Sequence, residues 1–420
     1  MMINVLVEQN KHWQAEVYQS VSRDKLQKLI GYLPLKQIIT ITGVRRCGKS
    51  TLVKQAINYL IEEGVNSGNI LFVNLEHPFF LEYRHDANFL NTIYDEYLKL
   101  MNPKGKVYCI FDEVQYFDNW QVYVKSKYES SLIKFIITGS NSSMLSNDLN
   151  TLLSGRSLNI HLDTFSFSEF LDYKKIEYKG EFNQTANKID ISRAKDEYLK
   201  WGGFFEVFQI EDELIKKELL TSYAKNIIYQ DIVPRYNIRN SEVVERLYFY
   251  LLTTASGILN YTTLAKIFEV SDRTIKEYIQ YFEEVYLLKR IDKFHNKPKE
   301  KIKSFKKVYS LDNGFLQLPS KHSSDLGLAL ENMVFNVLNQ RSESVTYLKE
   351  THEVDFYSDD TLYQVTYDMR DERSKEREVN AFNYFKFKHN VKKKVITYDS
   401  EMNLAEIECI KLERFILEGL

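Results

Sequence analysis

The pattern Gly-x-x-x-x-Gly-Lys-Ser fills residues 43–50, and no other feature restricts the fold of this chain as strongly. A β-branched apolar run at 37–42 precedes it and predicts a buried strand. Apolar residues at helical spacing follow it over 50–61, until Gly64 ends the run. A strand, a glycine-containing loop and a helix in this order predict a binding site for a nucleoside triphosphate, which we expect to be ATP.

Each residue type in this Walker A loop has a physical role. Gly43 and Gly48 let the backbone curl, so that successive N–H groups and the helix dipole face one anion. Lys49 can reach the β- and γ-phosphates, and Ser50 can offer its hydroxyl to Mg²⁺. The expected ATP-binding residues are Gly43, Val44, Arg45, Arg46, Cys47, Gly48, Lys49, Ser50 and Thr51.

Three of these loop residues have two interpretations each. Arg45 and Arg46 are either solvated loop charges or contacts to a phosphate or a partner. Cys47 fits a small filler at a tolerant position better than a redox switch.

Four more short apolar runs alternate with helical segments and predict a parallel sheet covered on both faces. They lie at residues 69–75, 107–111, 135–138 and 158–162. The run at 107–111 leads directly into Asp112 and Glu113, the two acids that a Walker B strand needs. We expect Asp112 to hold Mg²⁺ together with Ser50, and Glu113 to polarise the attacking water.

Two polar residues after the Walker B strand are further catalytic candidates. Asn141, beside Ser140, is expected to orient water or contact the γ-phosphate, and a plain turn is the alternative. Arg156 is either an arginine finger, acting in cis or across a subunit boundary, or a surface arginine paired with a carboxylate.

Composition limits the remaining possibilities. A chain of 420 residues is too long for one core, and 44% hydrophobic residues indicate packed globular domains. The net charge of −2 gives no global argument for nucleic acid or membrane. Three widely spaced cysteines and the lack of a long apolar stretch favour a cytoplasmic location.

Taken in order, the motifs resemble those of a large uncharacterised bacterial and archaeal family of AAA-type ATP-binding proteins. The resemblance rests on the arginine-rich loop at 43–50, Asp-Glu-Val-Gln at 112–115, Thr-Gly-Ser at 138–140, Leu-x-Gly-Arg at 153–156 and a phenylalanine-rich stretch at 165–170. A Gly-Gly-Phe-Pro-Glu turn is typical of the family, and this chain has Phe205 in place of the proline. The similarity covers nearly the whole chain and implies ATP binding more firmly than any biological process.

The character of the sequence changes near residue 241. Short helices at 261–268 and 270–284, the second capped by Ser271, predict a helix-turn-helix, and runs at 287–291 and 307–311 would be its wing strands. Lysines gather in and between these strands. The expected DNA contacts are Arg273, Lys276, Lys297, Lys299 and Lys301. The alternative is a solvated hairpin on a domain that packs against its neighbours.

From residue 327 the predicted order is a helix, three strands, a helix and a strand, which resembles the core of the PD-(D/E)xK nuclease superfamily. Glu331 and Asp355 match the first two acidic positions. The third position reads Gln364-Val-Thr366, where active members have Glu-x-Lys. This difference favours a degenerate scaffold that binds nucleic acid or protein, although Glu331, Asp355 and Gln364 could still form a weak metal site.

We therefore expect an α/β protein with the parallel sheet of a P-loop NTPase of the AAA (ASCE) type, a helical lid, a winged helix and a restriction-endonuclease-like domain. The expected domains are the ATPase core at 1–164, the lid or linker at 165–240, the winged helix at 241–312 and the nuclease-like domain at 313–420.

The functional hypothesis is an Mg²⁺-dependent ATPase whose nucleotide state controls a C-terminal module that interacts with nucleic acid or protein. The alternatives are a nucleotide-gated DNA-binding regulator and a defence nuclease with residual metal-dependent cleavage. The expected partners are DNA, another protein or further copies of the chain. We do not expect the protein to bind a membrane.

Overall fold

The computed structural model describes residues 2–86, 88–129, 132–142, 155–295, 297–319, 326–367, 369, 372–400, 403–404 and 406–417. These residues form two compact units. The first consists of Met1–Thr164 with Glu284–Tyr286, and the second of Phe165–Glu283 with Leu287–Leu420. Among the described residues, no helix combines the length and the apolar character needed to cross a bilayer.

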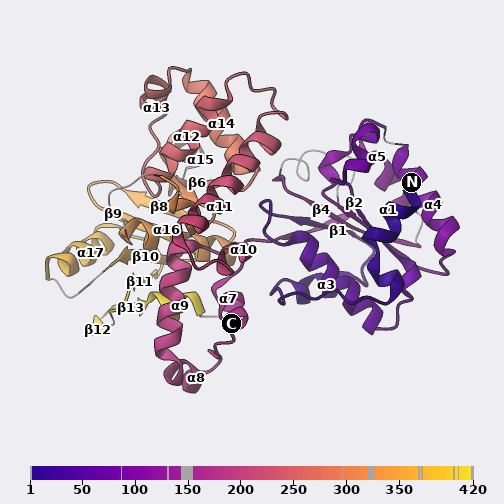
Figure 1. Ribbon diagram of the computed structural model, residues 1–420. Coiled ribbons are helices and arrows are strands. Elements are labelled where there is room, and N and C mark those ends of the chain that lie inside the picture. The colour runs from indigo at the N-terminus through magenta and orange to yellow at the C-terminus, as the bar shows by residue number, and fades with distance from the viewer. Residues whose placement is uncertain are drawn as a thin grey trace. The chain divides into compact units, whose positions relative to one another are not determined.

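The first unit is built on a five-stranded parallel sheet with the strand order β2-β3-β4-β1-β5 (Figure 1). Its strands are β1 (Ile38–Thr42), β2 (Ile70–Asn74), β3 (Val107–Asp112), β4 (Ile133–Gly139) and β5 (Ser157–His161). The parallel sheet predicted from the sequence is confirmed. Because all strands run the same way, the carboxyl ends of β1, β3 and β4 meet at one edge, where the predicted Walker residues lie.

Helices cover both faces of this sheet, and Figure 1 shows α3 and α5 on opposite sides of the strands. The α-helices are α1 (Met2–Gln9), α2 (Leu26–Tyr32), α3 (Lys49–Glu62), α4 (Phe89–Met101) and α5 (Trp120–Tyr128). The 3₁₀ turns are η1 (Lys11–Gln14), η2 (Ser67–Asn69), η3 (Pro78–Tyr83) and η4 (Val114–Tyr116). One core cluster joins α1, α4 and α5 to β2, β3 and β4, and its largest fully buried side chain is Trp120. This packing fixes the strand ends that carry the site.

The second unit contains an eight-stranded mixed sheet with the order β12-β13-β11-β10-β9-β8-β6-β7. Its strands are β6 (Leu288–Lys293), β7 (Lys306–Ser310), β8 (Thr346–Lys349), β9 (Glu353–Ser358), β10 (Thr361–Thr366), β11 (Lys392–Thr397), β12 (Asn403–Leu404) and β13 (Ile407–Lys411). The hairpin β6-β7 corresponds to the two expected wing strands. It joins β8 through a short parallel pairing, so one sheet crosses the boundary expected at 312/313.

Helices make up the rest of the second unit. Those before the sheet are α7 (Phe167–Lys174), α8 (Glu181–Ala186), α9 (Lys188–Trp201), α10 (Phe205–Phe208), α11 (Glu213–Asn226), η5 (Ile227–Ile232), α12 (Ser241–Thr253), α13 (Tyr261–Phe268) and α14 (Asp272–Glu284). Those within or after it are α15 (Pro298–Lys303), η6 (Asn313–Gln317), α16 (Leu326–Arg341), α17 (Glu372–Tyr384) and α18 (Leu412–Leu417). The backbone N–H of Thr274 donates to the hydroxyl of Ser271 at 3.0 Å, which is the cap expected for α14. α16 packs against β7, β9 and β10, and this contact brings distant acidic residues together.

Candidate nucleotide-binding site

Two glycines shape the loop between β1 and α3. A Cβ atom on Gly43 would lie 2.0 Å from the carbonyl oxygen of Leu162, so a side chain at this position has no room. Gly48 caps α3 with φ +99°, a left-handed conformation that glycine adopts without strain. Because α3 begins at Lys49, the unpaired N–H groups of its first turn face the loop, as anion binding requires.

The ammonium of Lys49 is buried inside the loop. It donates to the carbonyl oxygens of Gly43 at 3.1 Å and Val44 at 3.2 Å. It also lies 3.2 Å from Oε1 of Glu113. Burial acts to lower the pKa of Lys49, but Glu113, Cys47 and Asp112 together outweigh burial and leave this pKa above its usual value. Lys49 is therefore a charged ammonium held by contacts that a phosphate can replace.

Hydrogen bonds join α3 to the ends of β3 and β4. The hydroxyl of Ser50 donates to Oδ2 of Asp112 at 2.6 Å, and the hydroxyl of Thr138 donates to Oδ1 at 2.6 Å. The backbone N–H of Glu113 donates to the same Thr138 oxygen at 2.9 Å. Burial, followed by the neighbouring Glu113 carboxylate, raises the pKa of Asp112 to about 6. The structure thus brings the two expected metal ligands, Ser50 and Asp112, into direct contact.

The carboxylate of Glu113 is held from two sides. Lys49 contacts one of its oxygens, and the side-chain amide of Gln115 donates to the other. Burial acts to raise the pKa of Glu113, but Lys49 and then Gln115 outweigh burial and lower this pKa. Glu113 is consequently ionised, which is the state that a water-polarising base needs.

Gln115 belongs to this site although the sequence analysis gave it no role. Its Nε2 also donates to the hydroxyl of Ser140 at 2.9 Å, so it links Glu113 to the tip of β4. Its Oε1 is buried and has no hydrogen-bond partner among the described residues. A buried acceptor left unpaired is costly unless water or a ligand completes it. The Asp-Glu-Val-Gln run at 112–115 could have indicated a role for Gln115, because Gln115 is the one polar residue of this run apart from its two acids.

Arg23 is a second residue that sequence reasoning missed. Its guanidinium donates to the backbone carbonyl of Cys47 and to that of Asp163, the latter at 2.8 Å. The side chain is buried, and it lies where a Cβ on Gly48 would approach it at 2.7 Å. Arg23 therefore stabilises the loop by hydrogen bonding to its backbone. No local motif pointed to it, because it lies 24 residues from Cys47 in the sequence.

The two loop arginines differ. Arg45 is paired with Glu76 and donates to the phenol oxygen of Tyr116 at 3.1 Å. Arg45 is therefore tied to its own unit instead of being a solvated charge. Arg46 is exposed, with φ +67°.

The apolar loop positions are buried. Val44 and Cys47 are both nearly inaccessible, and burial raises the pKa of the Cys47 thiol. Cys47 is thus in the protonated, unreactive form that a packing residue would have. Thr51 lies partly buried in the first turn of α3.

Asn141 and Arg156 lie at opposite edges of the sheet. Asn141 is buried just after the carboxyl end of β4, on the side of the phosphate loop. Arg156 precedes the amino end of β5, whose five residues separate it from that edge by roughly 16 Å. Its guanidinium lies 5.6 Å from the ring centre of Tyr128. An arginine finger acting in cis is therefore not supported by this arrangement, and a role across a subunit boundary stays a prediction.

The residues of this site fit Mg²⁺ and a triphosphate. The loop backbone leaves no room for side chains at Gly43, the first turn of α3 presents free N–H groups, and Ser50 and Asp112 offer adjacent oxygens. Lys49 can exchange two carbonyl contacts for phosphate oxygens. The unpaired oxygen of Gln115 is free to accept a hydrogen bond from water.

The second unit brings together the residues of the expected nuclease site. The backbone N–H of Asp355 donates to Oε1 of Gln364 at 2.7 Å. Glu331 reaches the same place from α16, and between Glu331 and Asp355 lies the ammonium of Lys307, from β7. The sequence analysis did not assign Lys307 to this site. Its signal was hidden because Lys307 lies in a different element, well before the acidic residues.

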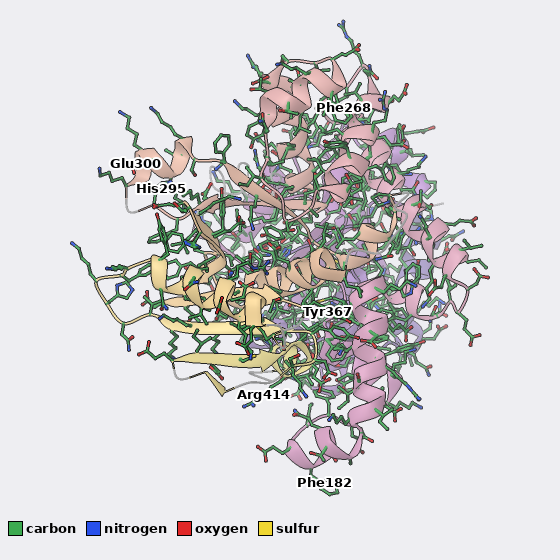
Figure 2. The ribbon with its side chains drawn as sticks, turned by 90° about the vertical axis from the view of Figure 1, so that its left-hand side faces the viewer. Phe182, Phe268, His295, Glu300, Tyr367 and Arg414 are labelled. Atoms are coloured by element: carbon green, nitrogen blue, oxygen red, sulfur yellow. The ribbon has the colours of Figure 1, made fainter. Side chains whose placement is uncertain are left out.

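The expected DNA contacts are mostly engaged within the second unit. Arg273 contacts Glu277 at 2.8 Å, and Lys276 lies 5.2 Å from the ring centre of Tyr261. The lysines of α15 lie near acids: Lys297 is 3.5 Å from Glu300, and Lys301 is 3.7 Å from Asp292. Figure 2 shows Glu300 and the nearby His295 at this helix, and their side chains approach to 3.6 Å. Lys299 has no ion-pair partner among the residues that the structure describes. The basic patch is thus partly neutralised by its own acids.

Comparison with known proteins identifies relatives along nearly the whole chain. An uncharacterised protein of Methanocaldococcus jannaschii is 32% identical over 91% of this chain and 86% of its own length. An uncharacterised protein of Haemophilus influenzae is 30% identical over 95% of this chain and 99% of its own length. The chain belongs to their family. Its residues 35–171 match the AAA domain, and residues 192–325 match a domain of unknown function (DUF8612).

Solved structures resemble this AAA-domain protein only distantly. The Aeropyrum pernix ORC1 protein in complex with DNA has 11% identity and a TM-score of 0.34, covering 70% of this chain and 90% of that one. AMPPCP-bound DnaA from Aquifex aeolicus has 15% identity and a TM-score of 0.27, covering 65% of this chain and 91% of that one. These scores are too low to support a conclusion.

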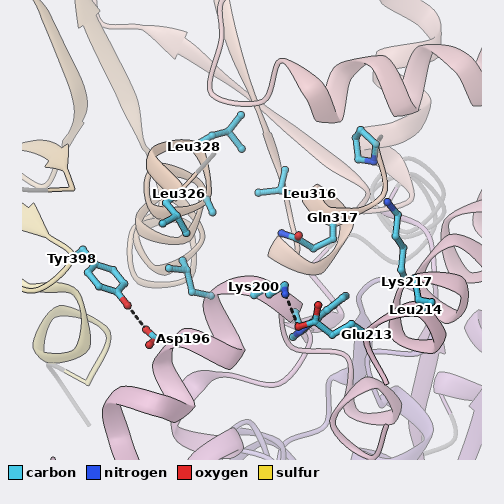
Figure 3. A pocket seen from close by; sticks show the side chains of 14 residues that line it. Asp196, Lys200, Glu213, Leu214, Lys217, Leu316, Gln317, Leu326, Leu328 and Tyr398 are labelled. Atoms are coloured by element: carbon cyan, nitrogen blue, oxygen red, sulfur yellow. Dashed lines mark hydrogen bonds and ion pairs between the residues drawn. The ribbon is translucent and has the colours of Figure 1, made fainter. Parts of the chain in front are cut away.

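The second unit of this AAA-domain protein also contains a cavity of about 530 Å³ (Figure 3). Side chains of α9, α11, η6 and α16 line it, together with Tyr398. Two polar contacts lie in its wall: Lys200 to Glu213 at 2.5 Å, and the Tyr398 hydroxyl to Asp196 at 2.5 Å. The volume suits a small molecule. Because these groups already satisfy one another, the cavity presents no assembled reaction centre among the described residues.

Proposed function

We propose that this protein binds Mg²⁺ and ATP at residues 43–50 and hydrolyses ATP by cleaving the bond to the γ-phosphate. The observation that carries the proposal is the convergence of Lys49, Glu113 and the Ser50–Asp112 pair at one edge of the parallel sheet. The match of residues 35–171 to the AAA domain supports it. The distinct roles of two adjacent acids follow from their contacts, since Asp112 faces Ser50 and Glu113 faces Lys49.

In the proposed mechanism, Lys49 leaves the carbonyl oxygens and Glu113 and turns to the β- and γ-phosphate oxygens. Ser50 and Asp112 would hold Mg²⁺, and the ion would supply positive charge to offset the charge of those oxygens. Glu113, released from Lys49, orients a water molecule and accepts its proton. As the new oxygen–phosphorus bond forms, the bond from the γ-phosphorus to the bridging oxygen breaks, and ADP and phosphate leave.

Gln115 acts as a positioning residue in this proposal. Its amide keeps hold of the Glu113 carboxylate and of Ser140, while its unpaired Oε1 accepts a hydrogen bond from the attacking water. Asn141, next to Ser140, is the proposed sensor at the tip of β4. A finger contribution from Arg156 would have to come from another copy of the chain.

Two substitutions test the proposal. Lys49→Ala removes the ammonium that faces the phosphates and should abolish tight ATP binding, measured by calorimetry. Glu113→Gln keeps the shape of the side chain but removes the carboxylate that accepts the proton of water, so it should retain ATP binding while turnover falls by about 10²–10⁴-fold. Unchanged turnover in Glu113→Gln would contradict the assignment of the base.

We further propose that the nucleotide state controls binding of DNA or a protein partner by the second unit, in which residues 165–240 act as a lid and 241–312 as a winged helix. The capped helix α14 supports DNA as the partner, as does Lys299, for which the described part of the chain offers no ion-pair partner, although most of the basic residues are paired. The test is the ATPase rate with and without duplex DNA at two salt concentrations. Stimulation that falls steeply with salt supports DNA binding, because phosphate contacts release counterions. No effect of DNA at either salt concentration would favour a protein partner.

A further inference from the structure

The nuclease-like domain expected from the sequence would hold a divalent cation between an acidic helix residue and an acidic strand residue. Glu331 on α16 and Asp355 on β9 occupy those two positions. Whether the centre can hold a metal depends on what already lies between these carboxylates and on which of their oxygens remain free.

The ammonium of Lys307 fills the space between the acids. Its Nζ lies 2.7 Å from Oε1 of Glu353, 3.1 Å from Oε1 of Glu331 and 3.9 Å from Oδ1 of Asp355. The side chain of Lys307 is 4% exposed, so these carboxylates are its partners in place of solvent. A single cation with three carboxylates around it is the arrangement that a bound metal ion would otherwise create.

Other donors occupy further oxygens of this cluster. The phenol of Tyr309 donates to Oε1 of Glu331 at 2.8 Å. The backbone N–H of Val365 donates to Oδ2 of Asp355 at 2.8 Å. The second oxygen of Glu353 lies 2.6 Å from the ammonium of Lys349.

Both polar atoms of the Gln364 side chain, the expected third ligand, are also engaged in hydrogen bonds. Its Oε1 accepts the N–H of Asp355 at 2.7 Å, and its Nε2 donates to Glu378 of α17. Glu378, a carboxylate that the sequence analysis did not place here, is paired in turn with Arg377. The carbonyl oxygen of the Gln364 side chain, which the sequence offered as a metal ligand, thus accepts a backbone hydrogen bond.

We propose that the Lys307 ammonium takes the position of a divalent cation, so that a cation of the chain itself occupies this centre and the centre works without metal. The residues do not fit a metal ion: among the described residues, no group of three or more His, Cys, Asp or Glu side chains has metal-binding geometry. Lys307 instead joins β7 to α16 and β9 through its three carboxylate contacts.

The consequence concerns what the second unit can do. A cavity of about 310 Å³ borders the cluster and is lined by Asp355, Gln364 and Arg377, among others. Because the cation of the centre is covalently part of the chain, this cavity is not the active site of a metal-dependent phosphodiesterase. The inference does not rest on the nucleotide site, and ATP hydrolysis can fail or succeed independently of it.

The test is Mn²⁺ binding, measured by electron paramagnetic resonance on the full chain without nucleotide. Wild-type protein should bind no Mn²⁺ at this centre, and the Lys307→Met variant should bind one ion there. A double variant that carries Lys307→Met and Asp355→Asn should bind none. Mn²⁺ should also raise the melting temperature of Lys307→Met and leave that of the wild type unchanged. Lys307→Gln, which keeps hydrogen-bond donors toward the carboxylates, provides a second variant if Lys307→Met does not fold.

Three results would overturn the proposal. The first is Mn²⁺ bound by the wild type and lost on Glu331→Gln. The second is a folded Lys307→Met or Lys307→Gln protein that gains no Mn²⁺. The third is Mn²⁺-dependent DNA cleavage by the wild type that disappears in Asp355→Asn. If neither Lys307 variant folds, the wild-type titration decides alone, with no bound Mn²⁺ supporting the proposal.

Discussion

Each unit of this protein contains a buried lysine whose ammonium contacts acidic side chains, one in the first unit and three in the second, and the two lysines differ in what holds them. Lys49 lies on a glycine-containing loop, with two backbone carbonyls and one carboxylate as its partners. Lys307 lies in a strand of the sheet, with three carboxylates around it. The first lysine can change partners at low cost when an anion arrives, whereas the second is fixed by the surrounding sheet and helix.

The difference shows that similar residue types produce different chemistry according to the backbone that carries them. Near Lys49, Ser50 and Asp112 present adjacent oxygens, and Gln115 keeps one unpaired acceptor. Near Lys307, every neighbouring acid already has a donor from the protein. A buried acceptor without a donor marks a site that a ligand can complete, whereas each acid around Lys307 is held by at least one donor of the chain itself.

The largest expected effect comes from removing the second lysine. Lys307→Met removes a buried ammonium from between three partly buried carboxylates, so the free energy of unfolding should fall by about 3–5 kcal/mol. Lys49→Met should cost less, because it leaves one carboxylate that Gln115 still contacts. Urea unfolding of both variants measures the difference. An equal or larger loss in Lys49→Met would contradict the contrast between the two centres.

A smaller effect should follow from Gln115→Leu. This change removes the amide that positions Glu113 and the acceptor for water, so kcat should fall by about 100-fold, as for a misplaced catalytic group. The affinity for ATP should stay unchanged, because Gln115 contacts neither the loop nor Lys49. Steady-state kinetics with a separate ATP-binding measurement distinguishes the two effects. If weaker ATP binding alone explained the loss, the positioning role of Gln115 would be wrong.

The smallest effect should come from Lys349, whose ammonium is 43% exposed beside Glu353. Burial acts to raise the pKa of Glu353, but Lys307 and Lys349 outweigh burial and lower this pKa. Ionised Glu353 therefore stabilises the fold above the pKa that a glutamate has in the unfolded chain, near 4.3. This stabilisation is lost as the pH falls through the lower pKa of Glu353 in the folded protein. Lys349→Gln should cost about 0.2–1 kcal/mol at pH 7. Unfolding curves at several pH values should show this cost vanish in acid, and a cost that grew in acid would contradict the assignment.

The sequence predicted the first unit well because its motifs are local. The loop at 43–50, its flanking strand and helix, and the acids at 112–113 follow one another within strand–loop–helix units, where spacing fixes geometry. Gln115 was within reach of the same reasoning, since it shares the Walker B run. Arg23 was not, because it reaches the loop from a segment with no pattern of its own.

The second unit was predicted less completely for a topological reason. The order of its helices and strands from α12 to β11 followed from the sequence pattern. The pairing of β6 with β8, which places β7 beside the acids, depends on contacts between segments far apart in the chain. A comparison with Glu-x-Lys on one strand therefore found Thr366 and overlooked Lys307. The sequence left Arg156 open between an arginine finger and a surface arginine, because its position before β5 did not reveal that it lies at the amino ends of the strands.

The most direct test of the contrast between the two centres is a Mn²⁺ titration of the wild-type protein, followed by electron paramagnetic resonance with and without a nonhydrolysable ATP analogue. The account predicts one tightly bound Mn²⁺ per chain in the presence of the nucleotide, abolished by Asp112→Asn, and none in its absence. Mn²⁺ bound without nucleotide, and lost on Asp355→Asn, would contradict it.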